Sequence, residues 1–252
     1  NLQVQRLCAS GISFCGSDVG GFIDQPSGEL FVRWVQLAAF HPFFRTHSSG
    51  DHGDQEPWSF GLDNMKLAKR FIELRYELLL YFYTTFYQYS KYARPMIKSL
   101  IVHDSSDGEV KNRMDESIVG DHIMVCPILQ PGVHERILYV PTGQWYNYWT
   151  DELFDGKQEI TVNADLTEMP LFIRAGAVIP KIPVMQYVGE HPIDTIDLHV
   201  YFSENKVESQ LYFDALDGYE CEDGEYQLSE FAVHGSKDLL SISQSTSGNG
   251  YG

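Results

Sequence analysis

Two short polar segments carry the side chains best suited to chemistry, and each directly follows a hydrophobic run. Asp18 follows the run 12–15 and lies in a glycine-rich loop, whereas Arg45 and His47 follow the run 41–44. Charged residues at strand ends are candidates for ligand contact in barrel enzymes. A histidine and an arginine placed there can donate hydrogen bonds to hydroxyl groups and orient a carboxylate. The pattern therefore predicts a site for a polar, hydroxyl-bearing ligand.

Simpler interpretations exist for both segments. Asp18 could cap a turn, as aspartate often does, and the loop around Arg45 and His47 could be a solvated polar loop. A metal site would use a set of four loop residues, but their spacing matches no zinc signature. That set is His47, Asp51, His52 and Asp54.

Aromatic residues crowd the same loops, and aromatic faces stack on sugar rings, although most aromatic side chains belong to a core. The set comprises Phe22, Phe40, Phe43, Phe44, Trp58 and Phe60. Phe22 and Trp58 lie in polar or glycine-rich segments and are the two candidates for ligand contact. We interpret Arg33 and Trp34 as structural, and Arg75 as an ion-pair partner inside helix packing.

The first part of the chain alternates between helix and strand patterns. A helix that ends at Gly11 precedes a strand at 12–15, and a helix with one apolar face follows at 29–40. A second strand at 41–44 precedes a long helix at 63–92. This order predicts parallel strands joined by crossover helices.

After residue 95, short apolar runs separated by Gly, Pro, Asn or Asp predict an antiparallel β-sandwich. The expected strands are 123–129, 136–140, 145–149, 160–162, 171–174 and 177–179. A smaller second β domain is expected beyond residue 183, with strands at 196–202, 209–213 and 239–243.

Composition excludes several classes of protein. The 252 residues are 43% hydrophobic and carry a formal net charge of −17, so the chain is globular and would repel nucleic acid and anionic lipid. The four cysteines form no CxxC pair, which argues against a zinc knuckle or a disulfide framework. The longest apolar run, 123–129, is far shorter than the ~20 residues of a membrane helix.

Several motifs in register resemble glycoside hydrolase family 31. They are GISFCGSDVGGF at 11–22, Glu29-Leu30, Arg33-Trp34, PFFRTH at 42–47, Glu56-Pro57-Trp58, Arg75-Tyr76, GDHIMVCP at 120–127, YVPTGQWYNYW at 139–149 and PLFIRAGAVIP at 170–180. The resemblance covers most of the chain and weakens after about residue 184.

The resemblance implies a mixed α/β part followed by an all-β part. Residues 1–94 would be the C-terminal segment of a (β/α)8 TIM barrel, with its strands seven and eight at 12–15 and 41–44. Residues 95–184 would form the proximal antiparallel β-sandwich, and residues 185–252 part of a distal β domain.

The resemblance also implies which residues bind the ligand. The histidine matching His47 contacts the sugar in the −1 subsite, the aromatic matching Phe22 lines that pocket, and Asp18 and Arg45 hold its polar network. A retaining glycosidase needs two carboxylates about 5–5.5 Å apart. In this family both are aspartates on earlier barrel strands, which the chain lacks, so we expect them upstream of Asn1 and expect the isolated chain to be inactive.

The implied partners are an α-glucoside or oligosaccharide substrate and the N-terminal half of the barrel, with no cofactor, metal, nucleic acid or membrane. Both ends look cut, and without the rest of the barrel we expect the apolar faces of 30–40 and 78–83 to be exposed. The alternatives are a non-catalytic sugar-binding or interaction module, or a family 31 α-xylosidase, α-galactosidase or transglucosylase. Compartment is undetermined.

Overall fold

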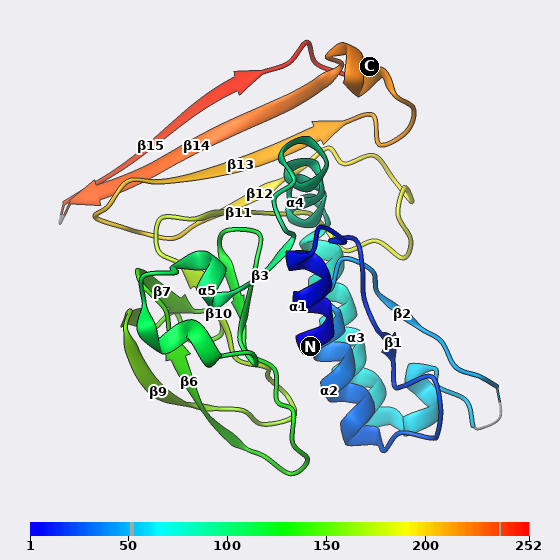
Figure 1. The fold of residues 1–252 in the computed structure, drawn as a ribbon. Helices are drawn as coiled ribbons and strands as arrows, with labels where there is room; N and C mark the ends of the chain where they lie inside the picture. Colours follow the sequence, from blue (N-terminus) through cyan, green and yellow to red (C-terminus); the bar gives the residue numbers. More distant parts are fainter. Residues whose placement is uncertain (51–52, 237, 252) are drawn as a thin grey trace.

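The computed structural model describes residues 1–50, 53–236 and 238–251. Three helices on one flank contribute side chains to a common core, a β-rich domain lies beside them, and a long three-stranded sheet crosses one end of both (Figure 1). The helices of the flank are α1 (Leu2–Ala9), α2 (Gly28–Ala38) and α3 (Leu62–Glu77), and α4 (Leu79–Tyr92) continues from α3 toward the sheet. Among the described residues, no helix is long and apolar enough to cross a bilayer.

Helix α2 confirms the predicted amphipathic helix. Its N-cap is Ser27, whose Oγ accepts a hydrogen bond from the Leu30 amide at 3.2 Å, and such a cap satisfies one of the free amides of the first turn. Phe31 and Val35 are buried on its inner face, and the Phe31 ring stacks on Phe60 with centroids 4.3 Å apart.

The expectation that the apolar faces of 30–40 and 78–83 are exposed is wrong. Most of these side chains belong to a core that helices α2, α3 and α4 share with the proximal β domain, where Ile123 and Leu171 are also buried. Leu30, 47% exposed, is an exception on α2. The helices therefore bury their apolar stripes against the sheet of the same chain.

The predicted long helix at 63–92 is two helices. The break is at Leu78, where the carbonyl of Glu77 accepts a hydrogen bond from the Ile182 amide at 3.0 Å. Beyond the break, α4 lies against β13, where the Tyr212 amide donates to Thr84 Oγ1 at 3.0 Å. A tertiary contact that periodicity does not register thus divides the helix.

The two parallel strands are shorter than predicted and lie further along the chain. They are β1 (Asp18–Val19) and β2 (Arg45–Thr46), and they pair in parallel. The predicted strand positions 12–15 and 41–44 are wrong, because these two segments are joined by isolated hydrogen bonds and not by a continuous strand pairing. One is the Phe43 amide donating to the Cys15 carbonyl at 3.1 Å.

The proximal domain is a six-stranded antiparallel sheet of order β3-β4-β5-β10-β7-β8, with β6 and β9 forming a separate ribbon. Alternate residues of its central strands enter two cores: Ile123 and Leu171 face the helices, whereas Met124 and Phe172 face the ribbon. Burial on both faces explains why the strands read as continuous apolar runs. The bounds are β3 (Ile97–Ser99), β4 (Ser117–Val119), β5 (Ile123–Val125), β6 (Glu135–Val140), β7 (Gln144–Asn147), β8 (Leu153–Asp155), β9 (Gln158–Asn163) and β10 (Leu171–Arg174), with α5 (Leu100–His103) and η2 (Gly108–Asn112) after β3.

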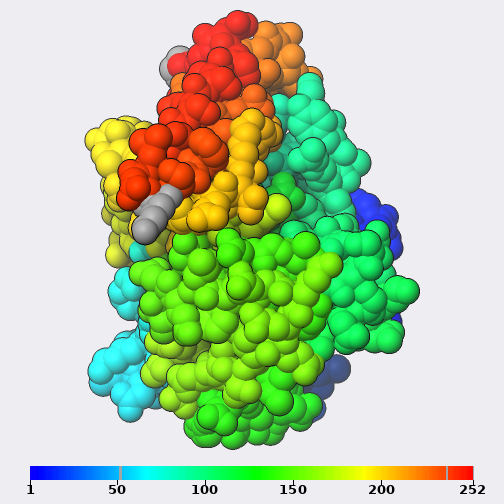
Figure 2. Space-filling view, turned by 90° about the vertical axis from the view of Figure 1, so that its left-hand side faces the viewer, coloured from blue at the N-terminus to red at the C-terminus, as the bar shows by residue number. Residues whose placement is uncertain are grey.

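The remaining strands form the distal part. β11 (Val178–Lys181) pairs with β12 (Asp197–Val200), and β13 (Val207–Asp214), β14 (Tyr226–Ser236) and β15 (Leu239–Ser247) form one antiparallel sheet, with η3 (Glu220–Asp223) between β13 and β14. In the space-filling view this sheet, orange to red, lies directly above the green proximal domain (Figure 2). Because β11 pairs with a strand beyond residue 184, the domain limits remain a prediction.

Candidate functional site

Asp18 and Arg45 form the centre of the candidate site. They are direct partners in the β1–β2 pairing, and Arg45 Nε donates to Asp18 Oδ1 at 2.8 Å. Their side chains are 25% and 46% exposed, respectively, so the ion pair is open to a ligand. The two segments that the sequence singled out therefore meet at one place.

Glycines allow this close approach. A Cβ added to Gly16 would lie 1.8 Å from the Phe43 carbonyl oxygen, so no other residue fits there without displacing the backbone. Gly20 and Gly21 have φ values of +89° and +95°, in the left-handed region that favours glycine. The Gly21 amide donates to the Asp18 carbonyl at 3.0 Å and so closes the turn after β1.

Phe22 and His47 lie beside the ion pair in sequence and contact each other. Their ring centroids are 5.5 Å apart with an interplanar angle of 39°. The Ser49 amide donates to the Phe22 carbonyl at 2.8 Å and ties the two loops together. Phe22 is 46% exposed, so much of its ring faces solvent. The structure thus brings all four predicted site residues into one region.

Two residues beneath the site support its loops. Trp34 Nε1 donates to Ser17 Oγ at 2.8 Å, directly before Asp18. Gln55, which is 7% exposed, donates through Nε2 to the Gly21 carbonyl at 3.3 Å. The structural interpretation of Trp34 agrees with this contact. No hydrophobic pattern or motif in the sequence points to Gln55, so only the structure shows that it holds the loop after β1.

The interpretation of Arg75 as an ion-pair partner is wrong. Its guanidinium donates to three backbone carbonyls, those of Ala39, His41 and Pro42, at 2.8, 2.6 and 2.9 Å, respectively. Burial lowers the pKa of Arg75 to about 10, so it stays protonated at neutral pH. It holds the segment that leads into β2 and thereby positions Arg45 and His47. Arg33 is structural as well, and donates to the Ala164 and Val133 carbonyls at 2.5 and 3.1 Å.

The other aromatic residues divide between core and surface. Phe40 is buried, and Phe44 and Phe60 pack partly buried against the core. Phe43 is 39% exposed. Trp58, the second candidate for ligand contact, is 68% exposed on η1 (Pro57–Phe60).

The possible metal site formed by His47, Asp51, His52 and Asp54 cannot be described, because Asp51 and His52 lie outside the described residues. Within the described ranges no group of three or more His, Cys, Asp or Glu side chains is arranged to hold a metal ion.

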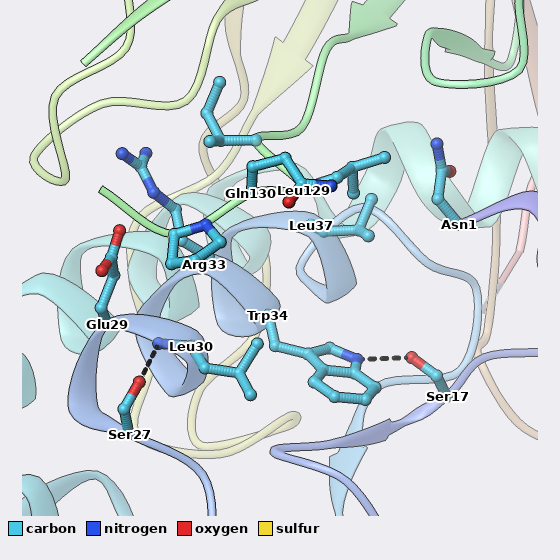
Figure 3. A pocket seen from close by; sticks show the side chains of 12 residues that line it. Asn1, Ser17, Ser27, Glu29, Leu30, Arg33, Trp34, Leu37, Leu129 and Gln130 are labelled. Atoms are coloured by element: carbon cyan, nitrogen blue, oxygen red, sulfur yellow. Dashed lines mark hydrogen bonds between the residues drawn. The ribbon is translucent and has the colours of Figure 1, made fainter. Parts of the chain in front are cut away.

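An apolar cavity of about 500 Å³ lies next to the site, between α2 and the segment 128–131 (Figure 3). None of the four predicted residues lines it. Its charged side chains are already engaged, since Glu29 accepts a hydrogen bond from the Gly132 amide at 2.8 Å and Arg33 is bound to carbonyls. We therefore place the candidate site at the Asp18–Arg45 pair rather than in this cavity.

Comparison with known proteins defines the class. The model of the Glycosyl hydrolases family 31 TIM-barrel domain matches residues 2–85, and that of the family 31 C-terminal domain matches residues 93–179. The chain belongs to glycoside hydrolase family 31 and comprises part of the TIM barrel followed by C-terminal β domains.

Similar proteins include Alpha-glucosidase 2 of Bacillus thermoamyloliquefaciens, 36% identical over 88% of this chain and 28% of the relative. An alpha-xylosidase of Saccharolobus solfataricus is 31% identical over 92% of this chain and 32% of that protein. A solved structure of a Flavobacterium johnsoniae family 31 dextranase, complexed with glucose, matches 99% of this chain and 32% of its own, with a TM-score of 0.93 and 25% identity. The chain thus spans about a third or less of these relatives.

Proposed function

We propose that the intact protein hydrolyses the O-glycosidic bonds of α-glucosides with net retention of configuration. This chain would supply one wall of the pocket for the sugar in the −1 subsite, through Asp18, Phe22, Arg45 and His47. One observation carries the proposal: in a chain of family 31, the Asp18–Arg45 ion pair and the Phe22–His47 ring contact join the same two segments.

The ion pair suits the recognition of sugar hydroxyls. A carboxylate has about four acceptor positions and a guanidinium has five N–H donors, so the bond from Arg45 Nε to Asp18 Oδ1 uses one acceptor position and one donor of these sets. Because each group fixes the other, a ligand meets acceptors and donors that are already oriented. Charge-assisted hydrogen bonds of this kind are stronger than neutral ones.

Phe22 and His47 complement the pair. The half-exposed ring of Phe22 offers an apolar face to the C–H groups of a sugar ring, and the imidazole of His47 beside it offers a polar nitrogen to a hydroxyl. A sugar has both surfaces, so this combination favours a carbohydrate over a purely apolar ligand.

The reaction needs a nucleophilic carboxylate and a separate carboxylic acid that protonates the leaving oxygen. Asp18 cannot supply both groups, because a carboxylate that attacks the sugar cannot protonate the leaving oxygen in the same step, and its Oδ1 already accepts a hydrogen bond from Arg45. We therefore expect both reacting aspartates in a part of the intact protein outside residues 1–252. The 252-residue chain alone should release no sugar.

The test is an assay of the intact protein on 4-nitrophenyl α-glucoside, α-xyloside and α-galactoside. We expect the highest kcat/KM on the glucoside. Proton NMR of the first-formed sugar should show the α-anomer, and a β-anomer would refute retention. Activity of the isolated chain would show that the reacting groups lie within it.

An α-xylosidase is the second candidate, because a relative of that name is 31% identical over 92% of the chain. Xylose lacks the hydroxymethyl group of glucose. A kcat/KM on the xyloside that exceeds the value on the glucoside would therefore select this alternative.

A further inference from the structure

A polar groove lies on the distal sheet, away from the Asp18–Arg45 pair. It has a volume of about 550 Å³ and is bounded by the end of α4, the turn between β4 and β5, and the strands β13, β14 and β15. We name it the distal groove and define it by Gln88, Asp121, His122, Gln210, Glu230 and Ser245.

The register of the sheet places a polar surface in this groove. Gln210 pairs with Glu230, which pairs with Ser245. Two residues along each strand, Glu208 pairs with Ala232, which pairs with Ser243. Residues directly opposite one another, and those two apart on a strand, share one face of a sheet. Five of these six side chains are polar, so this face is not built to be covered by another apolar layer.

Helix α4 covers the same face further along. Tyr87 stacks on Tyr212 with centroids 4.0 Å apart, and Tyr212 is two residues from Gln210 on β13. The helix ends at Tyr92, and beyond it the face is open. The groove is therefore the uncovered continuation of a helix-packed surface.

The polar groups in the groove are already oriented. Gln88 Nε2 donates to Gln210 Oε1 at 3.0 Å, and Gln210 Nε2 donates to Glu230 Oε1 at 2.9 Å. This chain of bonds crosses from α4 to β14 and presents amide and carboxylate groups side by side. Such an arrangement offers both donors and acceptors within the reach of one sugar unit.

His122 lines the groove with an unsatisfied ring nitrogen. The residue is only 7% exposed, and its Nδ1 has no hydrogen-bond partner among the described residues. Leaving a buried polar atom unpaired costs about 1–3 kcal/mol, but this nitrogen is enclosed by protein atoms, so we do not count it among the ligand contacts. Burial lowers the pKa of His122 to about 4, so the ring is neutral at pH 7.

The charges in the groove favour a neutral ligand. Arg94 lies 3.9 Å from Asp121, and Lys206 donates to Glu208 at 2.8 Å, so most of the charged groups pair with one another. An anion or a polycation would have to break these pairs. A ligand with many neutral hydroxyls would not.

We propose that the distal groove is a second carbohydrate-binding site, which takes a short neutral oligosaccharide through hydrogen bonds with its amide, carboxylate and hydroxyl groups. Phe231, the aromatic side chain in its wall, is 4% exposed and offers no stacking platform. Binding therefore rests on hydrogen bonds in competition with water and should be weak, with Kd on the order of 1 mM. The proposal does not depend on the proposed hydrolase activity, since the ligand class follows from the groove itself.

The test is calorimetric titration of the intact protein with S-linked maltotriose, which glycosidases hydrolyse poorly. We expect a class of low-affinity binding sites for the trisaccharide, and His47→Ala should not change its Kd. Glu230→Ala combined with Ser245→Ala removes exposed side chains from the groove, and should weaken this class about tenfold or more while kcat/KM on the aryl glucoside stays unchanged.

The matched control is Thr246→Ala, which alters the adjacent residue on the opposite face of β15 and should leave the weak class intact. A single class of sites abolished by His47→Ala would overturn the proposal. So would a weak class unaffected by the groove substitutions, or one lost equally in Thr246→Ala. A weak class that survives in a protein without hydrolase activity would uphold this proposal while the proposed function fails.

Discussion

The rings of Phe22 and His47 lie 5.5 Å apart, although 25 positions separate them in the chain and each belongs to a different loop. Phe22 contributes an apolar ring to this contact, and His47 contributes a ring with polar nitrogens. The contact joins the loop after β1 to the loop after β2, and the Asp18–Arg45 bond joins the two strands themselves.

His47→Ala should lower the kcat/KM of the intact protein on an aryl α-glucoside by a factor equivalent to about 2–4 kcal/mol of transition-state binding, because hydrogen bonds between the imidazole and the sugar are lost. His199→Ala on β12, an exposed histidine far from the site in sequence, is the control. A value for His47→Ala within threefold of wild type would rule out this role.

Asp18→Asn should lower kcat/KM by about 1–3 kcal/mol, because it keeps the shape of the side chain but removes the charge that orients Arg45. Steady-state kinetics of the intact protein measure the loss. Complete retention of activity would mean that the ion pair only closes a turn.

Gly16→Ala should destabilise the fold by about 2–4 kcal/mol, since the added Cβ would lie 1.8 Å from the Phe43 carbonyl and force the two segments apart. Urea denaturation measures the free energy of unfolding. Gly108→Ala is the matched control, because a Cβ there meets nothing within 4 Å and the change should cost less than about 1 kcal/mol. Equal effects of the two substitutions would contradict the close approach.

Arg75→Met should cost about 3 kcal/mol of stability, because the carbonyls of Ala39, His41 and Pro42 lose their shared donor. Arg75→Lys keeps the charge but not the fork of N–H groups, so it should recover only part of this loss. Full recovery by lysine would show that charge alone matters.

Stability should fall as the pH is lowered, in part because of His41. This residue is 1% exposed, its ring nitrogens have no partner among the described residues, and burial lowers its pKa to about 3 from an ordinary value of 6.5. Between these values the unfolded chain binds a proton that the folded chain does not, so the free energy of unfolding decreases with decreasing pH by up to about 1.4 kcal/mol per unit.

Urea denaturation from pH 7 to pH 4 measures this slope. His41→Leu should reduce it by about one proton's contribution. It should not abolish the slope, because burial also lowers the pKa of His122. The exposed His234 supplies the control, since His234→Leu should keep the wild-type slope. An unchanged slope in His41→Leu would exclude the effect.

Local pattern was informative wherever local forces dominate. The amphipathic helix α2 follows its hydrophobic period closely, and β5, β7 and β10 of the proximal sheet coincide with short apolar runs of the sequence. The strands of the parallel pair did not, because β1 and β2 each contain only two residues and their pairing depends on how closely Gly16 approaches Phe43. The prediction of one helix at 63–92 is wrong for a similar reason, since the Ile182 amide that donates to the Glu77 carbonyl is distant in sequence.

The residues by themselves determined the order of helix-rich and strand-rich parts, the family and the four candidate side chains, because residue type, period and spacing are local properties of a chain. Only the tertiary structure decided that Asp18 meets Arg45, that Phe22 meets His47 and that Arg75 binds carbonyls. It alone also revealed the distal groove. Those contacts join segments separated by 25 or more positions, and their geometry depends on how helices and sheets pack together, which no short stretch of sequence specifies.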